Sequence, residues 1–114
     1  TCRPTEKQAE DYFHHAVVEN ADWAAVDLIV GKRGKPREQL TEDEFQKQRS
    51  GYAMGMGGLR IVGDPDQVAY QLSELSKAGL RGIGISLVNY ADELPYYRDE
   101  VLSRLERMGL RQKA

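Results

Sequence analysis

The chain has 114 residues, of which 40% are hydrophobic and 30% are charged, a composition typical of one water-soluble domain. A formal net charge of −2 gives no overall attraction to nucleic acid or to an anionic membrane, and no hydrophobic run approaches the length of a membrane span. The only cysteine, Cys2, excludes an internal disulfide and a cysteine-based zinc site, so we expect a cytoplasmic protein without a metal. Because the sequence begins with Thr1 and not with methionine, we also expect a truncated or processed piece.

Three helices are predicted in the first half of the chain. Thr5 with Gln8, and Thr41 with Glu44, have the spacing of a capping box at a helix start. The first helix carries hydrophobic residues at helical spacing through Val17, which indicates one buried face. The expected helices cover about residues 5–17, 22–30 and 41–49, with a polar loop at 31–36.

Residues 51–58 contain four glycines, so we predict that they form neither a helix nor a strand interior. Residues 59–62 are a short extended candidate. Asp64 then has the position of a helix cap, and Pro65 lies in the first turn, where proline is tolerated. This fourth helix is expected to end at Gly79.

The run Ile83–Val88 is almost continuously hydrophobic, which is typical of a parallel strand covered by helices on both faces. A last helix is predicted from near Asp92 to Met108, so the C-terminal part has the helix, strand, helix order of an α/β fold. A buried strand needs neighbours, because each unpaired backbone group would cost about 1–3 kcal/mol. The chain supplies only weak further strands, so we expect it to belong to a larger sheet, or to dimerise or exchange segments when isolated.

The stretch Ile61–Ala69 (IVGDPDQVA) resembles a motif of the luciferase-like, flavin-dependent monooxygenases. A weaker likeness involves Cys2–Thr5 together with Ala9. The resemblance is good over about residues 51–111, roughly half of the chain, and loose before them. The matching residues that follow the motif are Leu72, Leu75, Ala78, Gly79, Gly82, Ile83–Ser86, Tyr90, Glu93, Leu94, Glu100–Leu102, Arg104, Leu105 and Gly109–Arg111.

This resemblance implies an α/β fold, with the chain as the C-terminal fragment of a (β/α)₈ TIM barrel, mostly helical with one parallel strand. Residues 1–60 would be a helical inserted segment and the glycine-rich loop, and residues 61–114 the last helix–strand–helix unit. The implied chemistry is oxygenation of a small organic substrate by O₂ and reduced flavin mononucleotide (FMN), with a deazaflavin as the alternative. Similar members are the alkanesulfonate, dimethyl-sulfide-type and pyrimidine monooxygenases.

In that family most flavin-binding residues come from earlier strands, so the isolated chain is expected to be inactive and its catalytic residues are unknown. The resemblance implies a flavin reductase as partner of the parent enzyme, and we expect a homo-oligomer that binds neither nucleic acid nor a membrane. The alternative interpretation is a non-catalytic oligomerisation or binding module derived from a barrel segment.

Two candidate site residues follow the predicted strand. Asn89 and Tyr90 would lie at the rim where loops after the strands of a barrel build the active site. Tyr90 matches a position where some relatives keep a tyrosine near the substrate, although its ring could equally pack on the next helix. Asn89 could also be an ordinary turn residue.

The glycine-rich residues 51–58 resemble the inserted loop that covers the flavin in relatives. As a lid, they would bring Tyr52, Met54 and Met56 to a hydrophobic substrate or to the flavin ring. Arg49 beside them could attract the flavin phosphate or an anionic substrate. A simple linker between helices, with a solvated arginine, is the competing interpretation.

Overall fold

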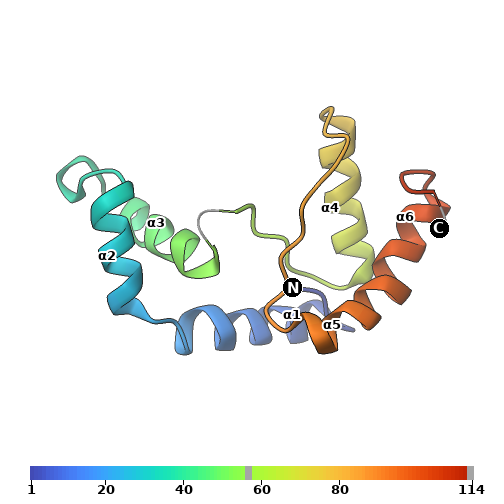
Figure 1. Ribbon diagram of the computed structural model, residues 1–114, viewed down its shortest axis with the longest axis horizontal. Coiled ribbons are helices and arrows are strands. Elements are labelled where there is room, and N and C mark those ends of the chain that lie inside the picture. Colours follow the sequence, from blue (N-terminus) through green and yellow to red (C-terminus); the bar gives the residue numbers. More distant parts are fainter. Residues whose placement is uncertain (56–57, 113–114) are drawn as a thin grey trace. The chain divides into compact units, whose positions relative to one another are not determined.

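The structure is a computed structural model, and it describes residues 1–55 and 58–112 (Figure 1). Of the described residues, 66% are helical. It divides into two compact units, which are described separately. Unit 1 combines Thr1–Tyr12 with Ile61–Ala114, and unit 2 is Phe13–Arg60.

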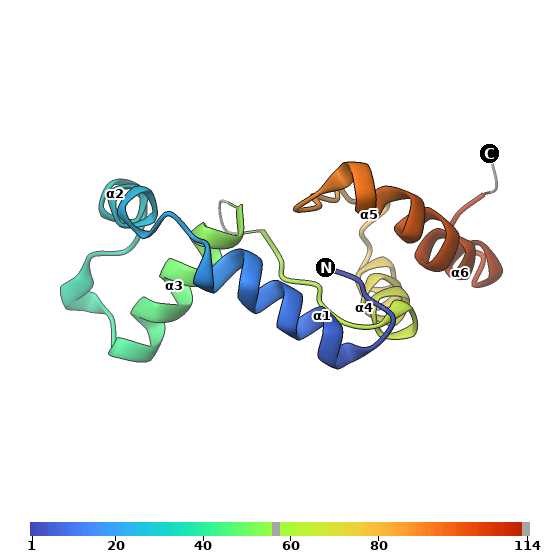
Figure 2. The ribbon, with the colours of Figure 1, turned by 90° about the horizontal axis from the view of Figure 1, so that it is seen from below.

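Unit 1 is built mainly from two helical segments near the C-terminus. The first is a single α-helix, and the second bends through a π-helical turn but keeps helical backbone angles throughout. The first helix lies against the later part of the second (Figures 1 and 2). The elements are α1 (Glu6–Phe13), α4 (Pro65–Lys77), α5 (Tyr90–Tyr97), the π-helix η3 (Arg98–Leu102) and α6 (Ser103–Arg107).

Helix α4 starts as its sequence predicts. The Asp64 side chain accepts a hydrogen bond from the Gln67 amide at 2.9 Å, and the Gln67 side chain accepts one from the Asp64 amide at 3.0 Å. Pro65 follows the cap in the first turn, where its missing amide proton is not needed. At the other end, Gly79 has a φ of +100°, a conformation that favours glycine and ends the helix.

The core of unit 1 joins the start of the chain to its end. Cys2, only 4% exposed, packs with side chains of α4 and of the last helical segment. The backbone next to it pairs with residues 61–63: the Arg3 amide donates to the Gly63 carbonyl at 3.3 Å, and the Gly63 amide donates to the Thr1 carbonyl at 3.2 Å. The other buried members of this core are Val68, Leu72, Tyr97 and Val101.

Unit 2 is a small helical arrangement held by both hydrophobic and polar contacts. Val17, Val26 and Val30 are its buried hydrophobic residues. The Trp23 indole donates to the Val18 carbonyl at 3.2 Å, which ties the second helix back to the turn before it. The elements are the π-helix η1 (His14–Glu19), α2 (Trp23–Arg33), the short 3₁₀ helix η2 (Arg37–Gln39) and α3 (Glu42–Gly55).

The expected α/β barrel fragment is wrong for this structure. Residues 81–87, which include most of the predicted strand Ile83–Val88, have no regular secondary structure, and residues 88 and 89 form a turn. Within the described residues there is no strand, and the one parallel pairing is an isolated bridge between Cys2 and Gly63. The physical reason is that a strand needs a partner: the described residues offer this hydrophobic run no second strand with which to form a ladder of hydrogen bonds.

Two further predictions about local structure also fail. Helix α3 continues through Gly51 and ends at Gly55, so the first half of the glycine-rich stretch is helical. Helix α2 likewise continues through Gly31 to Arg33, beyond its predicted end. A single glycine inside a helix costs only about 1 kcal/mol relative to alanine, and continuing an existing helix can compensate for it.

Among the described residues, none of the helices combines the length and hydrophobicity needed to cross a lipid bilayer.

The cap of α4 gives a direct test of its stability. Asp64→Ala removes the acceptor for the Gln67 amide and should lower the free energy of unfolding by about 1 kcal/mol. Asp64→Asn keeps a side-chain oxygen and is the matched control, with a smaller effect. Urea unfolding followed by circular dichroism measures both, and equal losses for the two variants would contradict the assigned cap.

Burial raises the pKa of the Cys2 thiol from its ordinary 9.0 to about 11. Between about pH 9 and 11 the unfolded chain loses this proton while the folded chain keeps it, so the free energy of unfolding should fall as pH rises. Burial also raises the pKa of Tyr97 to about 12, which acts in the same direction at higher pH. In urea unfolding measured across this range, Cys2→Ala should show a shallower pH dependence than the unaltered chain, and an unchanged slope would contradict the burial argument.

Candidate functional site

The two candidate residues from the C-terminal part lie where the chain enters α5. Asn89 occupies the N-cap position, but its side chain does not cap the helix and instead donates to the Asp92 carboxylate at 2.7 Å. Tyr90 is the first helical residue and is 74% exposed. The Tyr90 ring therefore does not pack on the following helix as the competing interpretation required.

Three of the other candidates, Arg49, Tyr52 and Met54, lie in unit 2 on the later turns of α3. Tyr52 and Met54 are half-buried helical residues, not parts of a loop. Met56 lies outside the described residues. Arg49 forms a two-point ion pair with Asp27, at 2.6 and 3.0 Å, and its guanidinium lies over the Trp23 ring.

Unit 2 contains an open cavity of about 500 Å³ between α2, the following loop and α3, lined by residues that include Val30, Phe45 and Arg49. Its arginines are already paired: Arg49 with Asp27, and Arg37 with Glu42 at 2.5 Å. Tyr52 and Met54 do not line it. The two arginines of the lining are thus neutralised by carboxylates within the same unit, and Lys35 is a further cation of the lining.

In unit 1 the most unusual chemistry is a cluster of the buried Glu93 with the half-buried Arg3 and Tyr12, which we call the polar cluster. The Arg3 guanidinium donates to the Glu93 carboxylate at 2.7 Å and lies over the Tyr12 ring, 3.7 Å from its centre. Glu93 is only 7% exposed. Residues about ninety positions apart in sequence therefore meet beside the backbone pairing of Cys2 with Gly63.

The charge balance of the polar cluster is incomplete. Only one Glu93 oxygen is paired, and the other, Oε2, is buried without a hydrogen-bond partner among the described residues. Burial raises the pKa of the Tyr12 hydroxyl, and the neighbouring Glu93 carboxylate raises it further. The Tyr12 hydroxyl thus stays protonated and can donate a hydrogen bond. A buried carboxylate oxygen such as Glu93 Oε2 ordinarily accepts a hydrogen bond from a donor of this type.

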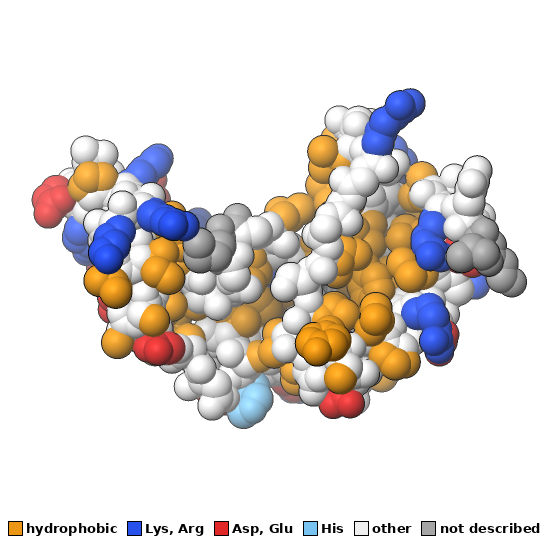
Figure 3. Space-filling view, in the orientation of Figure 1, with side chains coloured by type: hydrophobic (Ala, Val, Ile, Leu, Met, Phe, Trp, Pro, Cys, Tyr) orange, Lys and Arg blue, Asp and Glu red, His pale blue; other side chains and the backbone are white. Residues whose placement is uncertain are grey.

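The stretch 81–88, which we call the open segment, leads directly into Asn89 and Tyr90. Its backbone amides and carbonyls make no hydrogen bond within the part of the chain that the structure describes. Ile83, Ile85 and Val88 are 42%, 47% and 58% exposed, and only Leu87 packs partly against the core. In Figure 3, which has the orientation of Figure 1, hydrophobic side chains gather over α5 and next to this segment.

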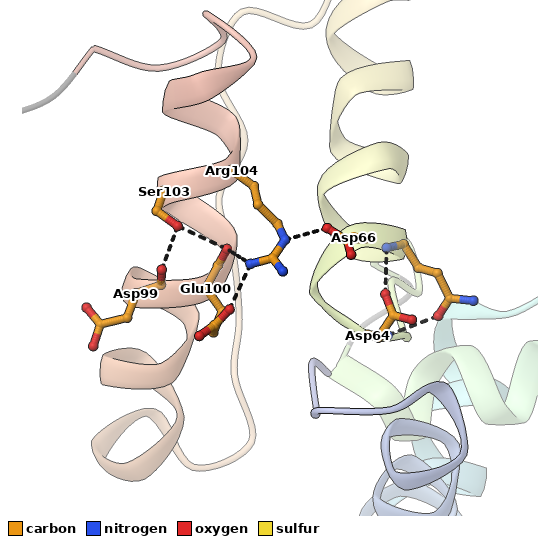
Figure 4. A network of polar contacts seen from close by, with 7 residues as sticks. Asp64, Asp66, Asp99, Glu100, Ser103 and Arg104 are labelled. Atoms are coloured by element: carbon orange, nitrogen blue, oxygen red, sulfur yellow. Dashed lines mark hydrogen bonds and ion pairs between the residues drawn. The ribbon is translucent and has the colours of Figure 1, made fainter.

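Besides the polar cluster, a group of ion pairs around Arg104 holds the helices of unit 1 together. Arg104 of α6 donates to Asp66 of α4 at 2.5 Å and to the Glu100 side chain at 2.7 Å (Figure 4). The hydrogen bonds to these two carboxylates raise the pKa of the Arg104 guanidinium, which therefore stays charged. Both carboxylates belong to the same unit as Arg104. The contact therefore stabilises the packing of the helices, and the Arg104 guanidinium is not available to a ligand.

Sequence analysis missed the polar cluster. Arg3 and Glu93 entered only as residues of a family-like pattern, and Tyr12 only as part of a hydrophobic helix face. Nothing in the local sequence marks them as neighbours, because the pairing depends on the N-terminal segment lying against residues 61–63. A glutamate at the fourth position of a helix is ordinarily solvated, so its burial has no sequence signal.

Comparison with protein-family models gave no match for this chain, and the comparisons with curated proteins and with solved structures gave none either.

The polar cluster can be tested by a double-mutant cycle. Arg3→Met leaves the buried Glu93 carboxylate without its ion-pair partner and should lower the free energy of unfolding by about 2 kcal/mol. Adding Glu93→Gln removes the unpaired charge and should restore part of that loss. Chemical unfolding of the two single variants and the double variant measures the coupling, and simple additivity would contradict a direct Arg3–Glu93 interaction.

Proposed function

We propose that the chain acts as a component of a flavin-dependent monooxygenase of the luciferase-like kind and binds no flavin by itself. The reaction would use reduced FMN, or a deazaflavin, and O₂ to oxygenate a small organic molecule. The flavin pocket would be supplied outside this chain, and a flavin reductase would supply the reduced cofactor.

The observation that supports this proposal is the composition of unit 1. The family-like parts of the sequence are Cys2–Thr5 with Ala9, and about residues 51–111. Cys2–Thr5, Ala9 and residues 61–111 belong to unit 1 although about fifty residues separate them, whereas residues 51–60 belong to unit 2. Residues of this family-like pattern have identifiable structural roles in unit 1: Cys2 packs in the core, Gly63 takes part in the backbone pairing, and Asp64 caps α4. A chance likeness would not be expected to gather in one folded unit.

Within such an enzyme the chain would contribute a binding surface and not the reacting groups. The candidates for contact with substrate or with the neighbouring part of the enzyme are Asn89 and Tyr90, which are exposed at the end of the open segment. Tyr90 presents both a hydrophobic ring and a hydroxyl donor. Neither residue is assigned a step of the reaction.

A second candidate function is a non-catalytic oligomerisation or binding module. The open segment favours it, because an exposed hydrophobic stretch whose backbone groups are not paired within the described residues is typical of a protein–protein contact. The two candidates differ in whether the assembly that contains the chain oxidises a substrate.

Two measurements test the monooxygenase proposal. Anaerobic titration of the full chain with reduced FMN, followed by calorimetry, should show no saturable binding, and micromolar binding with a defined stoichiometry would contradict a flavin pocket outside the chain. The assembly isolated through a tagged chain from the cells that make it should consume O₂ with reduced FMN when an alkanesulfonate, an organosulfur compound or a pyrimidine is supplied.

The control for the second measurement is the same isolation without added substrate, which separates oxygenation from uncoupled flavin oxidation. If the isolated assembly binds partners but shows no substrate-dependent flavin oxidation, the monooxygenase proposal fails and the binding module stands.

A further inference from the structure

The open segment has the properties of an unpaired β-strand, and we propose that two copies of the chain pair through residues 82–88 as antiparallel strands. This inference rests on the open segment alone and not on flavin chemistry. The self-pairing can therefore fail while the monooxygenase proposal stands, and the reverse also holds.

The first reason to expect a strand partner is a backbone that is free to pair. The amides and carbonyls of residues 81–88 have no hydrogen-bond partner in the described parts of the chain, while Ile83, Ile85 and Val88 are exposed to solvent. A second extended strand satisfies both requirements together, since it provides a ladder of backbone hydrogen bonds and covers alternate side chains. A helix laid on the same surface would cover the side chains only.

The composition of the segment favours a copy of itself as that strand. Residues 82–88 (GIGISLV) contain no charged residue and no proline, and they include Ile83, Ile85 and Val88, which are β-branched. Uncharged, hydrophobic stretches of this length are those that pair with identical segments, because no like charges are brought together. The protein carries no lysine or proline inside the stretch that would oppose such pairing.

Side-chain alternation then selects a register. In an antiparallel pair centred on Ile85, Ile83 of one copy lies opposite Leu87 of the other, and the two Ile85 side chains lie opposite each other on the same face. The opposite face places Gly84 against Ser86 and Gly82 against Val88. Ile83, Ile85 and Leu87 thus share one face, and Val88 is the one bulky side chain on the face that carries Gly82, Gly84 and Ser86. A shift by one residue would set the bulky side chains of one copy opposite the small ones of the other.

Charges at the ends of the segment support the antiparallel direction. Arg81 is exposed and makes no ion pair within the described residues. In the register centred on Ile85, Arg81 lies opposite Asn89 of the second copy, whose side chain is hydrogen-bonded to the Asp92 carboxylate at 2.7 Å. The arginine of each copy thus approaches a carboxylate of the other, whereas a parallel pair would set Arg81 beside Arg81. The arrangement is a closed two-fold contact.

Sedimentation velocity over a range of concentrations tests the proposal with charge variants at the centre of the pair. The unaltered chain should form a dimer, and Ile85→Lys should raise the dimer dissociation constant at least about tenfold, because it sets two like charges opposite each other. Leu28→Lys, at an exposed hydrophobic residue of α2 in unit 2, is the matched control and should leave the dimer unchanged. Circular dichroism checks that both variants keep their helices.

A mixing experiment makes the register testable. Ile85→Lys and Ile85→Glu should each be monomeric, and an equimolar mixture should recover the dimer because opposite charges then meet at the centre. Hydrogen exchange should show protection of amides within 82–88 in the dimer and not in the monomeric variants. The proposal is overturned by an unaltered chain that stays monomeric, by a dimer that Ile85→Lys leaves intact, by a mixture that does not recover, or by open-ended assemblies that grow with concentration.

Discussion

The pairing of the first three residues with residues 61–63 is the contact on which the rest of unit 1 depends. Two backbone hydrogen bonds between Arg3, Thr1 and Gly63 hold the N-terminal segment in place, and Cys2 then fills the space between α4 and the last helical segment. Because Arg3 is fixed by the same pairing, its guanidinium can reach Glu93, and a carboxylate that would otherwise be solvated becomes buried. One short segment therefore determines both the hydrophobic core and the polar cluster.

The helices were the predictable part of the structure, because their signals are local. Thr5, Asp64 and Gly79 act where their residue types predict, since a cap or a left-handed glycine depends only on a few neighbouring backbone groups. The prediction that Ile83–Val88 forms a strand failed because it depended on distant residues. A strand is defined by its partner, and hydrophobicity alone does not state whether the partner is present in the same chain. The extension of α3 through Gly51 shows that an established helix can override weak propensity.

The candidate site shows the same division between local and distant information. Asn89 and Tyr90 were expected to follow a strand, just before a helix that starts near Asp92, and the structure places them at the N-cap and the first residue of α5, after a segment without regular structure. For Arg49 the sequence left open an anion contact or a solvated side chain, and the structure pairs it with Asp27, a contact between two helices that no spacing rule reveals. The polar cluster was missed altogether, since it joins residues from the two ends of the chain. The contacts between charged residues far apart in the sequence were thus what sequence patterns could not predict.

The Arg104 contact has a consequence for how the chain tolerates interruption. Helix α4 and the last helical segment are held to each other by buried side chains and by the Arg104–Asp66 ion pair, not by the stretch that connects them in sequence. In a single copy the open segment of that connection is largely exposed and its backbone makes no hydrogen bond to the described residues, which are the properties of a site that a protease can reach. Cleavage there would leave the two helices attached to each other. For the same reason, an inserted peptide at this point would lengthen the connection without separating the parts that it joins.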